Sequence, residues 1–182
     1  MRISDIFVIK KNVLYSLAYD NQVHEFRRLF TLWIEDLAFL DSFFDDNIKD
    51  LESGYWGDIT IEEAIEQTRF MAIKLRQKFK NLLASNQPLQ TLFQPLDNNQ
   101  YQEKALSKEK SKEGWLRIYA IRISTNTYVI TGGAIKLTFK MHEAEHLKIE
   151  LQKLTIAKSY LIDEGLTDES DFGYFEFMSD IP

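Results

Sequence analysis

The pentapeptide His142-Glu143-Ala144-Glu145-His146 has the His-Glu-x-x-His spacing of zinc peptidases. On a helix, two histidines at this spacing lie on one face and bind Zn²⁺, while the glutamate serves as general base. A third ligand would have to be acidic, such as Asp163 or Glu164, because no histidine follows His146. The alternative is a charged first helical turn whose glutamates are stabilised by the helix dipole. The pentapeptide therefore allows a zinc-dependent hydrolase as an alternative to the other functions that the sequence indicates.

Basic side chains gather in the stretch 104–140, which carries eight Lys or Arg and two Glu. The basic members are Lys104, Lys108, Lys110, Lys112, Arg117, Arg122, Lys136 and Lys140. Residues 159–182 have the opposite sign, with seven Asp or Glu and no Lys or Arg. We interpret the two blocks either as solvated faces that balance each other, or as a basic site with an acidic tail able to cover it.

The composition is that of a single folded domain. A chain of 182 residues that is 45% hydrophobic has enough apolar surface for a core, which excludes wholesale disorder. The lack of cysteine excludes disulfides and thiol nucleophiles, and the net charge of −6 argues against non-specific nucleic-acid binding. No apolar run approaches a membrane span and the N-terminus does not read as a signal peptide. We therefore expect a cytoplasmic protein with no membrane contact and no cofactor.

Hydropathy patterns predict the elements that position these residues. Residues 13–19 read as a strand, and residues 24–51 as one long helix with an apolar stripe. Phe39 and Phe43 lie off that stripe, which indicates burial between layers or a homodimer interface through the aromatic helix 26–51. Thr60 and Glu63 form a capping signal for a second helix that ends near Ala84. The stretch 13–84 is thus predicted to be a strand followed by an antiparallel helical hairpin.

The second half of the chain changes to a strand period. Strands are predicted over 115–123, 127–131 and 134–139, with a tight turn or bulge at Gly132-Gly133. In the last of these strands Lys136, Thr138 and Lys140 alternate with apolar residues and share one face. A final helix over 143–162 ends near Gly165, and an acidic tail occupies 163–182. The predicted order is β-α-α-β-β-β-α, a single α+β domain over 1–182 with a small, mostly antiparallel sheet.

This order, together with two local patterns, resembles the RelE/ParE superfamily of bacterial toxins, in particular its HigB-like, phage-derived branch. The first pattern is a Leu-Arg-x-x-x-x-Arg strand, matched by residues 116–122. The second is an apolar strand, a small-residue turn and a basic segment, matched by residues 128–138, although Leu137 replaces a second Lys. The resemblance is best over 115–161 and only topological over 13–84.

The resemblance implies a ribosome-dependent mRNA endonuclease of a toxin–antitoxin module, with an antitoxin protein and the ribosome with its mRNA as partners. In such toxins a 2′-hydroxyl attacks the neighbouring phosphate, and fixed cationic side chains stabilise the developing charge. The implied catalytic residues are Arg117, Arg122, Lys136 and Lys140. The implied RNA-binding residues are Tyr119 and Tyr128, which would stack on a splayed base, and Thr138. The alternative from another class is a non-catalytic interaction or dimerising module of the same fold.

Overall fold

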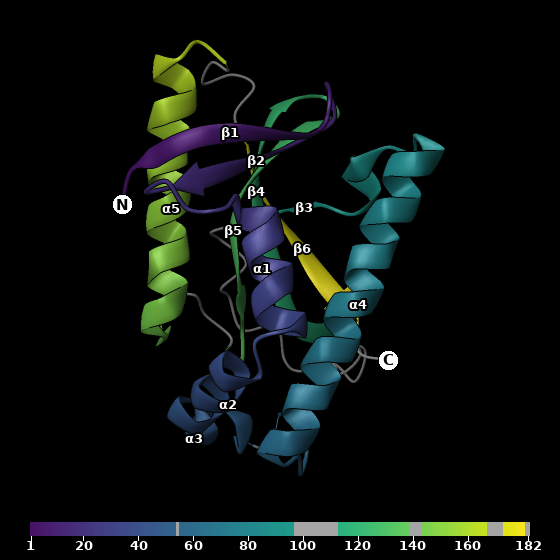
Figure 1. Ribbon diagram of the computed structural model, residues 1–182, viewed down its shortest axis with the longest axis vertical. Coiled ribbons are helices and arrows are strands. Elements are labelled where there is room, and N and C mark those ends of the chain that lie inside the picture. Colours follow the sequence, from purple (N-terminus) through teal and green to yellow (C-terminus); the bar gives the residue numbers. More distant parts are fainter. Residues whose placement is uncertain (54, 97–112, 139–142, 167–172, 181–182) are drawn as a thin grey trace.

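The computed structural model describes residues 1–53, 55–96, 113–138, 143–166 and 173–180 (Figure 1). Among these residues, six strands form one mixed sheet in the order β1-β2-β5-β4-β6-β3. All neighbouring strands are antiparallel except β2 and β5, which are parallel. The strands are β1 (Ile3–Lys10), β2 (Leu14–Tyr19), β3 (Gln94–Pro95), β4 (Glu113–Ser124), β5 (Thr127–Ile135) and β6 (Gly173–Asp180).

Helices cover both faces of this sheet, which confirms the predicted α+β class (Figure 1). One face packs against α1, α2 and α4, and the other against α5. The helices are α1 (Glu25–Ile34), α2 (Leu37–Asp46), α3 (Ile48–Leu51), α4 (Ile61–Ser85), α5 (Glu145–Asp163) and the short 3-10 turn η1 (Leu89–Thr91). None of the described helices is long and apolar enough to cross a membrane.

The central strand β4 belongs to both layers of the core. Ile118 and Ala120 pack on the side of α1 and α4, whereas Tyr119 and Ile121 pack on the side of α5. All four are fully buried. A strand covered on both faces carries apolar residues without a polar alternation, and this accounts for the sequence of β4.

The prediction of one long helix over 24–51 was wrong, because three helices occupy this stretch. The break lies at Glu35 and Asp36, where the Asp36 side chain accepts a hydrogen bond from the Phe39 amide at 2.9 Å and caps α2. The second predicted helix is confirmed as α4, with the capping box of Thr60 and Glu63 in place. Both α1 and α2 pack against α4, so the hairpin exists with a broken first arm.

Of the two alternatives at Gly132-Gly133, the tight turn was wrong, because β5 runs through both glycines to Ile135, and the third strand over 134–139 was wrong for the same reason. The bulge alternative is confirmed, since the register with β4 shifts between Ile130 and Gly132. Packing explains the glycines. A Cβ on Gly133 would lie 2.5 Å from the Arg117 carbonyl oxygen and 2.8 Å from the Leu29 side chain. The glycines therefore let helices approach both faces of an extended strand rather than turn the chain.

The element order differs from the predicted β-α-α-β-β-β-α at both ends of the chain. A strand not predicted from the sequence, β1, pairs with β2 at one edge of the sheet. The predicted acidic tail contains β6, which pairs with β4 and places Phe175 and Phe177 in the core. The two phenylalanines lie two residues apart, so both point to the same face of the strand. The segment therefore forms a strand of the sheet, because burial of the two phenylalanines stabilises it despite its acidic residues.

Candidate functional site

Arg117, the first residue of the predicted basic site, lies inside the protein and is 7% exposed. Its Nη1 donates to the carbonyl oxygens of Gly114 and Leu116, at 2.5 and 3.0 Å. Its Nε lies 4.0 Å from Oε2 of Glu176 on the neighbouring strand β6. The guanidinium is therefore directed at groups of its own sheet.

The other predicted basic residues are scattered rather than gathered on one strand face. Arg122 is half-buried, with its guanidinium 4.9 Å from the ring centre of Phe175. Lys136 and Thr138 are half-buried and follow the end of β5, so no strand alternation aligns them. Lys140 lies outside the described residues.

The two tyrosines predicted to stack on RNA are both fully buried. Tyr119 belongs to the core beneath α5. Tyr128 stacks on Phe93 with ring centres 4.7 Å apart, and meets the edge of Phe175 at 5.5 Å. Both rings serve the packing of the sheet in this structure.

Among the described residues of the His-Glu-x-x-His pentapeptide, Glu145 and His146 lie on helix α5 and Glu143 and Ala144 do not. Helix α5 begins at Glu145, so Glu143 precedes it, and His142 lies outside the described residues. His146 Nε2 lies 2.9 Å from the Ile135 carbonyl oxygen, and its ring packs on the edge of Phe43. The described part of the chain contains no group of three or more His, Asp or Glu placed to hold a metal ion.

A cluster of charged side chains that the sequence patterns did not predict lies between α1 and α5. We call Glu25, Arg28, Glu150 and Lys153 the buried charge cluster. Glu25 accepts from Arg28 through both carboxylate oxygens at 2.7 Å. Lys153 Nζ donates to Glu25 at 2.9 Å and to Glu150 at 2.8 Å. Glu25, Glu150 and Lys153 are at most 7% exposed, and the set is balanced with two charges of each sign.

The cluster adjoins the place where the sheet opens. The ladder between β2 and β5 ends at the pair Ser16 and Ile130, and in Figure 1 the two strands then run in different directions. Beyond that pair, the Tyr19 hydroxyl donates to the Thr131 carbonyl at 2.9 Å and bridges the strands. Ser16 Oγ accepts from the Phe26 amide at 2.9 Å, which holds the first turn of α1 near this opening.

Gly132 gives Glu150 its place in the cluster. A Cβ on Gly132 would lie 1.9 Å from Oε2 of Glu150, so the carboxylate occupies the space that a side chain would need. This oxygen is buried and accepts no hydrogen bond from the described residues. Burial outweighs the attraction of Lys153 and raises the pKa of Glu150 to about 7.

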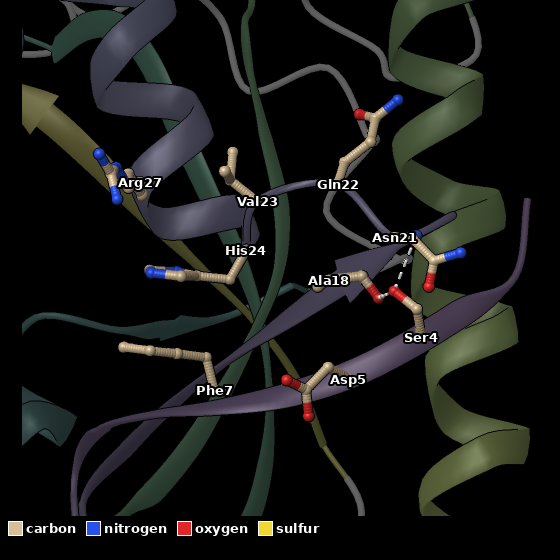
Figure 2. A pocket seen from close by; sticks show the side chains of 9 residues that line it. All are labelled: Ser4, Asp5, Phe7, Ala18, Asn21, Gln22, Val23, His24 and Arg27. Atoms are coloured by element: carbon tan, nitrogen blue, oxygen red, sulfur yellow. Dashed lines mark hydrogen bonds between the residues drawn. The ribbon is translucent and has the colours of Figure 1, made fainter.

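An open hollow lies on the outer side of the same region, between β1 and the first turn of α1 (Figure 2). It has a volume of about 450 Å³. Phe7 and His24 lie parallel in it, with ring centres 4.1 Å apart. Burial, together with the neighbouring Arg27, lowers the pKa of His24. The remaining lining residues are Ser4, Asp5, Ala18, Asn21, Gln22 and Val23.

The two sites have different chemical capacities. In the buried charge cluster both cations are bound by carboxylates of the cluster, so it suits cohesion of the two helical layers. The hollow presents an aromatic pair, a cationic Arg27 and an anionic Asp5 to solvent, so it suits recognition. The spacing of Glu150 and Lys153 was visible in the sequence, but pairs three residues apart are also typical of exposed helix surfaces.

Comparison with protein-family models, curated proteins and solved structures found no match to this chain.

The raised pKa of Glu150 predicts a pH-dependent stability. Because the ordinary value is 4.5 and the folded value about 7, the native state holds the extra proton between these two pH values. The free energy of unfolding therefore falls as pH rises through that window, by about 3 kcal/mol in total. Glu150→Gln cannot ionise and flattens this slope in urea titrations at pH 4.5 to 8. The exposed Glu145→Gln control keeps the wild-type slope, and a Glu150→Gln profile parallel to the wild type would contradict the assignment.

Proposed function

We propose that this protein is a non-catalytic interaction module, which binds an extended strand of a partner along the open edge of its sheet at β1. The observation that carries the proposal is the exposure of Phe7 and Val8 on that edge, 47% and 51%, next to the hollow. An edge strand offers unpaired backbone groups, and strand addition uses them for affinity and the adjacent side chains for specificity.

The burial of several residues predicted to bind RNA supports this proposal. Arg117, Tyr119 and Tyr128 are engaged in packing, and helices cover both faces of the sheet at β4. In the aromatic stretch predicted as a dimer interface, Phe30, Trp33 and Phe44 are at most 4% exposed, whereas Phe39 and Phe43 are half-buried. At the edge β1 and the hollow, exposed apolar and charged groups lie together.

Site-specific photo-crosslinking in cells tests this function. With benzoylphenylalanine in place of Val8, we expect a discrete crosslinked adduct, which is lost when Phe7→Lys is added. The same photoreactive residue in place of Ile149 is the matched control, because Ile149 is 43% exposed on α5, away from the edge. Absence of an adduct at Val8, or equal adducts at both positions, would contradict an interaction specific to β1.

A second proposal is the mRNA endonuclease, which keeps as support the sequence pattern over 115–161 and the half-exposed positions of Arg122 and Lys136. Induction in a bacterial host followed by mapping of mRNA 5′ ends tests it. This proposal predicts new ends within translated frames, lost in Arg122→Ala and Lys136→Ala and retained in the exposed control Lys80→Ala. An unchanged map from folded, well-expressed protein would refute it.

A further inference from the structure

The open edge of β1 has a regular stretch of defined length. Among the described residues, β1 pairs with β2 on one side and ends the sheet on the other. Its pairing with β2 is regular from Asp5 to Val8, and the register shifts on either side of that stretch. Bulges end strand pairing locally, so an added strand is confined to Asp5–Val8 and its immediate neighbours.

Opposite charges lie on the same face of this edge. Asp5 and Phe7 are two residues apart on β1, and both line the hollow together with Arg27 (Figure 2). Asp5 and Arg27 are exposed, and neither forms an ion pair within the described part of the chain. One Asp5 carboxylate oxygen accepts a hydrogen bond from the Ile6 amide at 2.8 Å. The edge therefore carries an exposed cation and an exposed anion whose second oxygen has no hydrogen bond to the described residues, and both face a second surface of the same kind.

We propose that the strand bound at this edge is β1 of a second copy of the chain, paired antiparallel with Ile6 opposite Ile6. This inference rests on the proposed function and names its partner. A two-fold axis through the pair keeps equivalent residues on the same face, so Asp5 of each copy lies opposite Phe7 of the other. The Asp5 carboxylate then faces the hollow whose wall includes Arg27.

The register with Ile6 at the axis is favoured by both charge and length. A shift to Phe7 at the axis would place Asp5 opposite Ile9, beyond the regular stretch that ends at Val8. With Ile6 at the axis, the pairs Asp5–Phe7 and Phe7–Asp5 fall inside it. The arrangement also brings the exposed side chains of Phe7 and Val8 against the second copy.

Sedimentation velocity and equilibrium of the purified full chain test this pairing by charge exchange. We expect a concentration-dependent monomer–dimer equilibrium. Asp5→Arg and Arg27→Glu each weaken it about tenfold, because each change reverses two symmetry-related contacts at once. The double variant, or an equal mixture of the two single variants, restores association. Asp41→Arg, an exposed charge reversal on α2, leaves it unchanged.

The outcomes separate this inference from the function on which it rests. A monomer at all concentrations, or no restoration in the double variant while circular dichroism shows folded protein, overturns pairing with a second copy. A Val8 crosslink to a different protein would then leave the interaction function standing with another partner. Loss of both the self-association and the Val8 adduct would overturn the function as well.

Discussion

Two buried carboxylates, the buried Lys153 and the half-buried Arg28 lie between α1 and α5 and govern how the helical layers meet across the sheet. Burial of Glu25, Glu150 and Lys153 is tolerable only while each charge keeps a partner, since the cost of an unpaired buried charge exceeds that of most packing defects. Lys153 contacts both carboxylates, so a shift of α5 along α1 would leave one of them without its cation. The same constraint reaches β5, where Gly132 leaves room for the Glu150 carboxylate, and β2, where Tyr19 closes the sheet beside Lys153.

This internal use of charge bears on where we propose that a partner binds. Arg117 contacts backbone carbonyls of β4 and faces Glu176, and Tyr128 stacks on Phe93. These side chains stabilise the middle of the sheet. The edge at β1 is built differently, with exposed apolar side chains and the exposed charges of Asp5 and Arg27 around a hollow. A module that binds a strand requires a rigid sheet and an edge with exposed side chains. A rigid edge loses little conformational freedom when it pairs with the added strand.

Local signals made part of this structure predictable. The capping box at Thr60 and the helix-ending Gly165, with its φ of +67°, mark α4 and α5 through residues near in sequence. The rest depended on long-range packing. The apolar stripe continues across Asp36, so the periodicity does not indicate the break before α2. The segment of β6 is acidic, so its composition does not indicate that its two phenylalanines are buried. Arg117 fits an exposed strand position in the sequence, and only the placement of β6 beside β4 shows that it is interior. In the sequence, Glu150 and Lys153 resemble an exposed pair on a helix surface. Their burial could not be predicted, because it depends on the contact with Glu25 of α1.

The role of the buried charge cluster is tested most directly by a double-mutant cycle on Glu25 and Lys153, in which the free energy of unfolding is measured by urea titration at one pH. Glu25→Gln takes the carboxylate from Arg28 and leaves Lys153 with Glu150 alone, and Lys153→Met takes the ammonium from both carboxylates. Each change should therefore lower the free energy of unfolding by about 3 kcal/mol or more. The double variant should lose clearly less than the sum, since it removes both charges together. Additive losses below about 1 kcal/mol each, the size typical of surface pairs, would contradict a central role for the buried charge cluster.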